Sequence, residues 1–509
     1  MGFMSSIEKE LLDGDMNKSY TENGAAGYKT TGKNLLDLNF QVSSLRKKQP
    51  VEIVDKFIDA FLDNKLYALK WLFYLRDVRE GLGERRSFRI IMNHLARYEQ
   101  DIAKTLVTLI PEYGRYDDLL CFLGTDCEVF ALAVIKEQLA KDMKNMEDNK
   151  PVSLLGKWLP SCNASSKQTR HNGTIVRTYL GLNERDYRKT LSKLREYIKV
   201  VERQMSAKEW DKINYETVPS RANLNYNGAF LRNDEERRRT YLENLKKGEA
   251  KINASVLFPH DIVNKYGMNQ WCVKKKDDSL EALWKALPDL VEGNSSTLVI
   301  RDGSGSMACG ISPNSNITAL DVATGLAVYF SERASGEFKD KYITFGKEPK
   351  VVDLTRMNTL RDKLIRSYKE ADCSNTNIEA TFDLILDTAI KGKMKQEDMP
   401  ENILIVSDME FDEATWGCGE LDQRLFNTIA TRFEEHDYKM PRLVFWNVNS
   451  RTGTIPVKEN ELGVALVSGF SVNVVKMVLS GELDPYKCLT EQLDSGRYVP
   501  IETAVKDLL

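Results

Sequence analysis

The chain has 509 residues, more than one hydrophobic core usually serves, so we expect two or more domains. Hydrophobic residues at 42% and charged residues at 29% are typical of a soluble, folded protein. No apolar run approaches the roughly 20 residues that a membrane helix needs, and the N-terminus lacks the apolar core of a signal peptide. With no C-x-x-C pair, the cysteines predict reduced thiols and no zinc site or disulfide framework. These features exclude a membrane protein and predict an intracellular, cytoplasmic one.

The net charge of −3 hides an uneven distribution along the chain. Residues 151–200 hold ten Lys and Arg against three Asp and Glu, a balance of +7. Residues 401–509 hold ten against eighteen, a balance of −8. We therefore expect the middle of the chain to meet a polyanion and the C-terminal part to carry acidic chemistry, although a solvated helical face is the simpler explanation of any single cluster.

Helical patterns dominate the first half of the chain. Residues 1–33 are polar and rich in Gly, Asn and Thr, which predicts an irregular N-terminal arm. Apolar residues then recur on one helical face, at Val54, Phe57, Ile58, Phe61 and Leu62. Similar patterns predict helices at 66–78, 88–98, 186–205, 259–266 and 280–290, with Asp117 capping another. Residues 34–292 are thus predicted to be an α-helical repeat domain, a HEAT-like solenoid or ring of stacked helix pairs.

Short apolar strands alternate with helices in residues 293–509. We expect strands at 297–301, 342–345, 403–407, 443–448 and 464–467, and helices at 318–333, 360–368, 378–389 and 421–433. Such alternation predicts a parallel sheet with helices on both faces, a doubly wound α/β domain.

One turn concentrates the polar side chains of this second domain. The first strand leads into Asp302-Gly303-Ser304-Gly305-Ser306, and Asp408 follows the strand at 403–407. If these strands are neighbours, both carboxylates face one crevice at the C-terminal strand ends, where such sheets bind ligands. Carboxylates and hydroxyls without imidazole or thiolate indicate Mg²⁺ or another divalent cation. The predicted metal ligands are Asp302, Ser304, Ser306, Thr376 and Asp408.

Other interpretations of this turn fit less well. Gly303, Gly305 and Ala308 also match a dinucleotide fingerprint, but an aspartate would then meet the pyrophosphate. A nucleophile elbow of the Gly-x-Ser-x-Gly type is absent, since Asp302 and Ser306 occupy its glycine positions. A purely structural capping turn stays open as an alternative. Catalytic residues and a hydrolytic activity are not expected, because no nucleophile or base accompanies the turn.

The turn, together with Thr376 and Asp408, resembles the metal-ion-dependent adhesion site of a von Willebrand factor A-type domain. The resemblance implies that the hydroxyls bind Mg²⁺, that the aspartates act directly or through water, and that one coordination position stays open for an acidic group of a protein partner. One departure is Met409, where many members of that family have glycine. Further acidic residues crowd the same loop, at Glu410, Asp412 and Glu413.

Helical repeats followed by an A-type domain resemble the architecture of the Ro autoantigen (TROVE) type of RNA-binding protein. Three segments also look like an uncharacterised family related to it: 75–85, 113–118 and 157–161. The resemblance covers nearly the whole chain from about Thr21. It implies a ring of helical repeats that binds structured or misfolded RNA, as in RNA quality control or a small-RNA ribonucleoprotein, and a monomer.

Basic residues beside aromatic ones support RNA as a partner. Arginines cluster around one helix turn at 76–89, and a polar stretch from Lys157 interleaves cations with Trp158, His171 and Tyr179. Such surfaces suit phosphate neutralisation and base stacking. The residues predicted to bind RNA are Arg76, Arg79, Arg85, Arg86, Arg115, Lys157, Lys167, Arg170, His171 and Arg177.

Two functions from different classes therefore remain open. One is a non-catalytic RNA-binding protein that uses the helical repeats, and it predicts RNA affinity that falls with salt. The other is a protein-interaction scaffold in which the metal site captures a partner's carboxylate and the helices support it.

Overall fold

The structure is a computed structural model that describes residues 16–24, 26–267, 275–291, 296–313, 315–344, 349–370, 378–411, 423–456, 464–474 and 484–509. The chain forms two compact units. The α/β unit comprises Met1–Gln49, Ile58–Asp63 and Leu257–Gln492, and the helical unit comprises Pro50–Phe57, Asn64–Val256 and Leu493–Leu509. The expected division at residues 33 and 292 differs from this one. The N-terminal segment belongs to the α/β unit, and the C-terminal segment belongs to the helical unit.

A sheet of six strands forms the centre of the α/β unit, in the order β5-β4-β3-β6-β7-β8. All neighbouring pairs are parallel except the β4–β5 pair. The strands are β3 (Thr297–Arg301), β4 (Lys341–Thr344), β5 (Lys350–Asp353), β6 (Asn402–Ser407), β7 (Arg442–Asn447) and β8 (Val464–Ser468). The sequence predicted five of these strands and missed β5, an edge strand with one buried residue.

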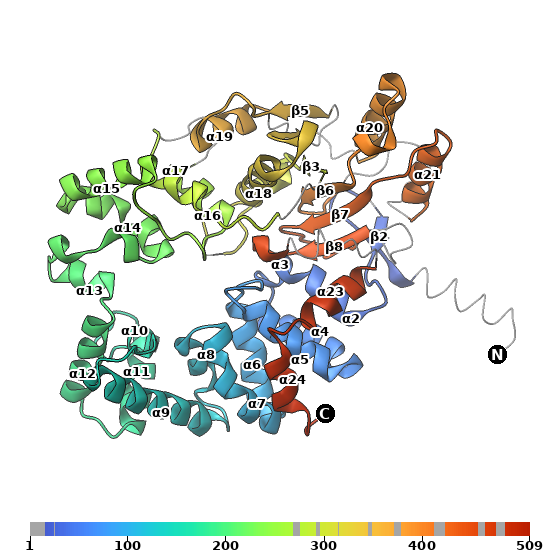
Figure 1. Cartoon of the computed structure of the whole chain (residues 1–509). Coiled ribbons are helices and arrows are strands. Elements are labelled where there is room, and N and C mark those ends of the chain that lie inside the picture. The colour runs from blue at the N-terminus through green and yellow to red at the C-terminus, as the bar shows by residue number, and fades with distance from the viewer. Residues whose placement is uncertain are drawn as a thin grey trace, which may run out of the picture. The chain divides into compact units, whose positions relative to one another are not determined.

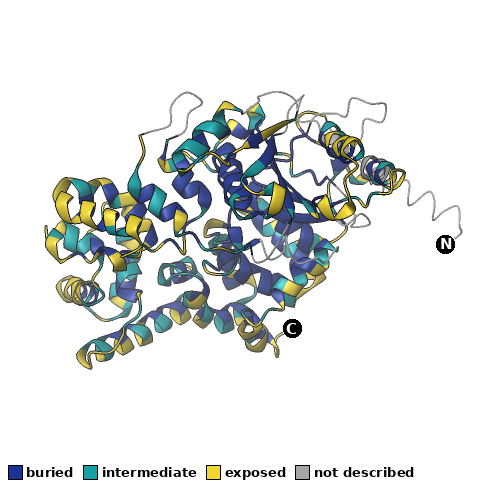
Figure 2. Cartoon of the chain, turned by 45° about the horizontal axis from the view of Figure 1, so that its top comes forward, coloured by how far each residue is buried: buried dark blue, intermediate teal, exposed yellow. Residues whose placement is uncertain are grey.

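Helices enclose the sheet, which is why the strands β3, β6, β7 and β8 carry runs of apolar residues. Helix α18 packs on β3, β4 and β6, and Figure 1 places α18 and α19 on one side of the strands and α20 and α21 on the other. Buried residues therefore concentrate in the strands (Figure 2). The helices of residues 257–493 are α16 (Pro259–Lys265), α17 (Asp278–Lys285), α18 (Ala319–Arg333), α19 (Leu360–Lys369), α20 (Ile378–Gly392), α21 (Gln423–Glu434) and α23 (Pro485–Leu493).

The N-terminal segment is an ordered part of the α/β unit from residue 16, apart from residue 25, which lies outside the described residues. Strands β1 (Lys18–Tyr20) and β2 (Ala26–Tyr28) form an antiparallel hairpin, and Tyr28 bridges to Ile455. Helices α2 (Asn34–Phe40) and α3 (Val42–Leu45) follow, and their backbone bonds Asn447 and Ser468 beside the ends of β7 and β8. The expected irregular arm is thus wrong for this part, because its polar residues bond the strand-end loops.

The helical unit consists of helices and short 3-10 turns. Its larger helices are α4 (Pro50–Asp63, shared with the α/β unit), α5 (Lys65–Arg76), α6 (Arg86–Tyr98), α7 (Gln100–Leu106), α9 (Glu128–Glu147), α11 (Lys167–Tyr179), α12 (Glu184–Tyr197), α14 (Ser220–Asn233) and α15 (Glu235–Lys247). The shorter helices are α8 (Ile110–Tyr113), α10 (Leu155–Trp158), α13 (Val201–Ser206) and α24 (Val499–Val505).

Most predicted helices are confirmed, with three differences. The helix expected at 186–205 is broken into α12 and α13, where Lys199 adopts a φ of 51°. Leu62, placed on the apolar face of the first helix, is 74% exposed. Asp117 does not cap a helix; Asp118 instead accepts the backbone N–H of Arg115 at the start of a 3-10 turn. In the described part of the chain, no helix is long and apolar enough to cross a membrane.

Ion pairs fix the C-terminal helix α24 and its lead-in within the helical unit. Arg497 pairs with the fully buried carboxylate of Asp77 at 2.8 Å. The buried ammonium of Lys70 pairs with Asp494 at 2.8 Å and with Glu502 at 2.7 Å. The last residues therefore complete a core that begins more than 400 residues earlier.

Candidate functional site

Two carboxylates meet at the point where the strand order of the sheet reverses. Asp302 follows β3 and Asp408 follows β6, and these strands are parallel neighbours, as expected. After β3, the strands β4 and β5 are added toward one edge of the sheet. After β6, the strands β7 and β8 are added toward the opposite edge. Doubly wound sheets bind ligands outside the C-terminal strand ends at such a point.

Hydrogen bonds hold the turn after β3 around the carboxylate of Asp302. Its Oδ2 accepts the hydroxyl of Ser407 at 2.6 Å, and its Oδ1 accepts the backbone N–H of Ser304 at 2.8 Å. The hydroxyls of Ser304 and Ser306 lie 2.9 Å apart. Four of the five predicted ligand residues thus come from adjoining turns, and the fifth, Thr376, lies outside the described residues.

The carboxylates of Asp302 and Asp408 are both buried and share one electrostatic environment. Burial raises the pKa of Asp302. Burial and the charge of Asp302 raise the pKa of Asp408 to about 7, against the lowering effect of the Ser306 hydroxyl. Oδ2 of Asp408 is buried and accepts no hydrogen bond from the described residues. Burial and two like charges close together favour binding of a proton or a cation at this pair.

The donor set fits a hard divalent cation better than a soft one. It offers two carboxylates and two hydroxyls, and Mg²⁺ prefers such oxygens and retains water. Among the described residues no group of three or more His, Cys, Asp or Glu side chains surrounds a common metal position. A cation here would therefore depend on the serine hydroxyls and on water in addition to Asp302 and Asp408.

The backbone after Asp408 explains why glycine suits the next position. Met409 has a φ of 63°, in the left-handed region that costs a non-glycine residue roughly 1–2 kcal/mol. Glu410 is buried and turns away from the site, since it accepts the backbone N–H groups of Arg451 at 2.7 Å and Thr452 at 3.0 Å. Glu410 thus accepts its hydrogen bonds from other backbone groups, although its charge still helps to raise the pKa of Asp408, whereas Asp412 and Glu413 lie outside the described residues.

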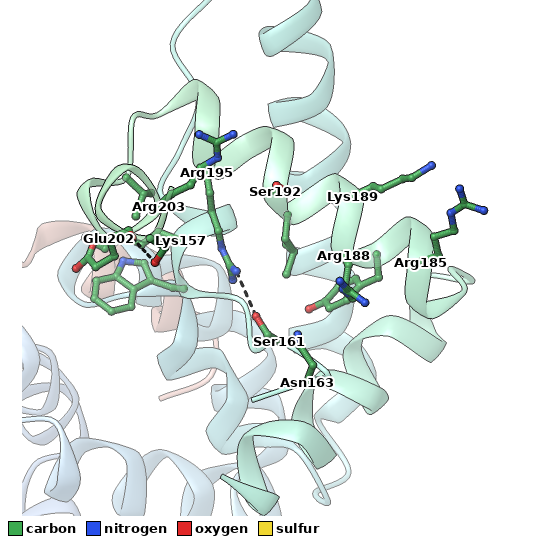
Figure 3. A pocket seen from close by; sticks show the side chains of 15 residues that line it. Lys157, Ser161, Asn163, Arg185, Arg188, Lys189, Ser192, Arg195, Glu202 and Arg203 are labelled. Carbon is green, nitrogen blue, oxygen red and sulfur yellow. Dashed lines mark hydrogen bonds between the residues drawn. The ribbon is translucent and has the colours of Figure 1, made fainter. Parts of the chain in front are cut away.

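A second feature is a basic groove in the helical unit, with a volume of about 1010 Å³. Its cationic side chains come mainly from α12, and Figure 3 shows Arg185, Arg188 and Lys189 along this helix. The acidic residue in its lining is Glu202. The groove is lined by Lys157, Trp158, Ser161, Asn163, Arg185, Tyr187, Arg188, Lys189, Leu191, Ser192, Arg195, Val200, Glu202, Arg203 and Ser206.

The cations of the groove divide into structural and exposed ones. Arg195 holds the floor, because it donates to the carbonyls of Gly156 at 2.8 Å and Leu159 at 3.0 Å and to the Ser161 hydroxyl (Figure 3). Arg203 pairs with acidic neighbours. Arg185, Arg188 and Lys189 are exposed and form no ion pair with the described carboxylates. These three charges remain available to an anionic ligand.

Trp158 gives the groove an aromatic wall. The guanidinium of Arg115 lies 3.7 Å from the centre of its ring, and the Lys157 ammonium lies 5.4 Å from it. The ring is half-buried at the end of α10. An aromatic face beside cations suits a nucleobase next to its phosphates.

Ion pairs occupy much of the arginine cluster predicted at 76–89. Arg76 is buried against Asp118 at 2.8 Å, so its prediction as an RNA contact is wrong for lack of exposed surface. Arg79 is exposed but pairs with Glu112 at 3.2 Å. The side chains of Arg85 and Arg86 reach the surface. Partial desolvation of the Arg85 guanidinium by its neighbours, together with the charges of Arg115 and Arg89, lowers the pKa of Arg85.

The other predicted RNA residues lie on or near the groove to different degrees. Lys157 lines it, and Arg115 covers its tryptophan. Lys167, Arg170, His171 and Arg177 belong to α11 and are not among the lining residues; Arg170 donates to the carbonyls of Ala164 and Ser165, and Arg177 to that of Leu182.

The sequence prediction missed Arg185, Arg188 and Lys189 as binding residues. Two signals pointed to them: the balance of +7 over 151–200, and the spacing of three and four residues that puts them on one face of a helix. Several charged residues on one helix are typical of a solvated face, so the sequence alone did not indicate a binding site. The neighbouring helices turn that face into one side of a groove.

Fold and sites together define a protein with a helical unit that carries a basic groove and an α/β unit that carries a buried carboxylate pair at its switch point. Residues 296–497 match a domain of unknown function, DUF7788, and residues 163–296 match another, DUF2828. The chain is 29% identical to the uncharacterized protein L728 of Acanthamoeba polyphaga mimivirus over 520 residues, which cover 94% of this chain and 87% of that protein.

Among solved structures, the crystal structure of the Deinococcus radiodurans RO (RSR) protein is similar at 12% sequence identity, with a TM-score of 0.44, over 86% of this chain and 93% of that one. A similarity at this level does not establish a common fold or function.

Proposed function

We propose that this protein binds RNA without catalysing a reaction, and that the basic groove beside α12 is its RNA-binding surface. The observation that carries the proposal is the set of exposed cations at Arg185, Arg188 and Lys189, which form no ion pair with the described carboxylates and line the same groove as Trp158. Phosphates supply most of the affinity of such surfaces, and stacking on an aromatic ring adds about 1–3 kcal/mol per base.

Single-stranded ends or loops of structured RNA suit this groove best. An unpaired base can turn toward Trp158 while its phosphates face α12, whereas a base inside a duplex cannot. The order of domains, which resembles the TROVE type, supports RNA over DNA, a HEAT-like arrangement of the helices, and a cytoplasmic ribonucleoprotein role in RNA quality control for a monomeric chain.

The test is RNA binding measured by fluorescence anisotropy with a labelled single strand of about 20 nucleotides at 50 and 200 mM salt. Reversing three charges, Arg185→Glu, Arg188→Glu and Lys189→Glu, should weaken binding at least tenfold and lower the salt slope by about 2. The matched control reverses Arg239, Lys246 and Lys247, which are exposed on α15 outside the groove. Equal losses of RNA affinity in both variants would contradict the assignment of the groove as the RNA-binding surface.

A second function follows from the unsatisfied oxygen of Asp408. We infer that Asp302, Ser304, Ser306 and Asp408, with Thr376, hold Mg²⁺ in a von Willebrand factor A-type domain. The ion would supply an open coordination position for the carboxylate of an acidic protein partner. Burial of both aspartates and the 2.9 Å separation of the serine hydroxyls support this assignment.

Direct cation binding tests this second proposal. Mn²⁺ serves as the probe, because its binding changes the relaxation of water protons. The wild-type chain should bind one ion, and Asp408→Asn should bind it at least tenfold more weakly. Equal affinity in the two chains would remove the site from consideration.

A further inference from the structure

Three charged side chains form a row that begins on the N-terminal hairpin and ends at the carboxylate pair. Nη1 of Arg451 lies 2.6 Å from Oε2 of Glu22, and Nη2 of the same guanidinium lies 3.9 Å from Oδ2 of Asp408. Within the described ranges, no donor hydrogen-bonds to that carboxylate oxygen. All three residues belong to the α/β unit.

Backbone contacts keep this row in place independently of the side chain of Glu22. Glu410 accepts the backbone N–H of Glu22 at 2.9 Å and that of Arg451 at 2.7 Å, so one buried carboxylate holds both segments. Thr21 donates to the carbonyl of Phe411 at 2.6 Å and Asn23 to that of Glu410 at 2.7 Å. Removing the Glu22 carboxylate therefore leaves the hairpin attached.

The guanidinium of Arg451 is shared unequally between the two carboxylates. It is within ion-pair distance of Glu22, whereas the distance to Asp408 exceeds that of a hydrogen bond. Its Nε is buried without a hydrogen-bond partner, so no further contact of that atom fixes the plane of the guanidinium. Without Glu22, the free Nη groups would find their nearest acceptor in the unsatisfied oxygen of Asp408.

We propose that Arg451 sets the cation affinity of the Asp302–Asp408 pair and that Glu22 restrains Arg451, so that the N-terminal hairpin tunes metal binding. This inference rests on the proposed metal site. A positive charge at this distance repels a divalent cation, and the repulsion is strong because Asp408 is fully buried. The Glu22 carboxylate reduces the repulsion by neutralising Arg451 and by holding it back.

A double-mutant cycle with Mn²⁺ alone as the probe tests the inference in the full-length chain. Arg451→Gln should bind Mn²⁺ roughly 3- to 30-fold more tightly, because the repelling charge is lost. Glu22→Gln should bind it roughly 3- to 10-fold more weakly, because Arg451 turns to Asp408. The double variant should match Arg451→Gln, since Glu22 acts only through Arg451.

Two controls separate this coupling from loss of structure. Arg451→Lys keeps the charge and should stay within about threefold of the wild type. Neutralising the Arg432–Asp383 pair, which joins α21 and α20 at 2.7 Å in the same unit, should leave Mn²⁺ affinity unchanged. Thermal unfolding in chelator should show that every variant is folded.

The outcomes are distinct. Tighter binding by Arg451→Gln, with no further effect of Glu22→Gln in its presence, supports the inference. Unchanged single variants, or effects that add independently, overturn it while the metal site stands. A wild-type chain that binds no Mn²⁺ overturns the metal site and this inference together.

Discussion

At the scale of single residues, Asp408 combines several features that oppose stability. Its carboxylate is buried beside that of Asp302, and one oxygen accepts no hydrogen bond from the described residues. Neither feature serves the fold without a cation, because burial and like charge both oppose ionisation. The turn after it also holds Met409 at a positive φ. Unfavourable residues that cluster in one place indicate function.

Asp408→Asn should accordingly stabilise the cation-free protein by about 1–3 kcal/mol, since the amide removes the repulsion and the unsatisfied anionic oxygen. Oδ1 of the amide can still accept the backbone N–H of Glu410. Denaturant unfolding in chelator measures the gain, and the same variant should lose the stabilisation that Mg²⁺ gives the wild type. A cation-free variant less stable than the wild type would contradict the assignment.

Helix packing determines the shape of the groove at the scale of elements. Helix α10 crosses α12 at Gly156, where a Cβ atom would lie 2.7 Å from the Cβ of Leu194. The carbonyl of Gly156 also accepts Nε of Arg195. This close approach brings Trp158 beside the cations of α12.

Gly156→Ala should therefore destabilise the protein by about 1–3 kcal/mol through overpacking and should weaken RNA binding, because α10 must move from α12. Gly228 is the matched control: it is exposed within α14, and the nearest atom to an added Cβ is the end of the Arg232 side chain at 3.5 Å. Gly228→Ala should stabilise by roughly 0.5–1 kcal/mol. Denaturant unfolding of both variants checks the opposite signs.

At the scale of the whole molecule, each end of the chain belongs to the unit formed mainly by the other half of the sequence. Residues 16–49, apart from residue 25, complete the α/β unit, and residues 493–509 complete the helical unit. Each end supplies a partner to a buried carboxylate. The N-terminal hairpin donates a backbone N–H to Glu410, and Arg497 pairs with Asp77. The chain therefore is not a helical domain followed by an independent α/β domain.

Deleting residues 1–33 should loosen the α/β unit, and deleting residues 493–509 should loosen the helical unit. Hydrogen exchange locates the effect: the first deletion should speed exchange at 402–411 and 442–456, and the second at 65–85. The second deletion leaves Asp77 buried without Arg497, which costs roughly 3 kcal/mol or more. Faster exchange confined to the unit next to each cut in the sequence would contradict this placement of the ends.

Local patterns determined the strands and the carboxylate pair. The run Thr297–Arg301 is β3 residue for residue, because a short segment with an apolar centre and β-branched residues favours the extended conformation. Alternation of strands with helices requires parallel pairing, and parallel pairing brings the carboxyl ends of strands to one edge. The neighbourhood of Asp302 and Asp408 followed from these two facts together with the adjacency of β3 and β6, which the sequence alone left as an assumption.

Contacts between distant residues determined what the sequence by itself did not. Lys350–Asp353 became a strand only because β4 pairs with it, and Arg76 became a core residue only because Asp118 reaches it from a later turn. Arg185, Arg188 and Lys189 became a groove because α10 and α13 adjoin α12. Periodicity reports which face of one element is apolar, whereas the partner of each charge is fixed only when the chain folds back on itself.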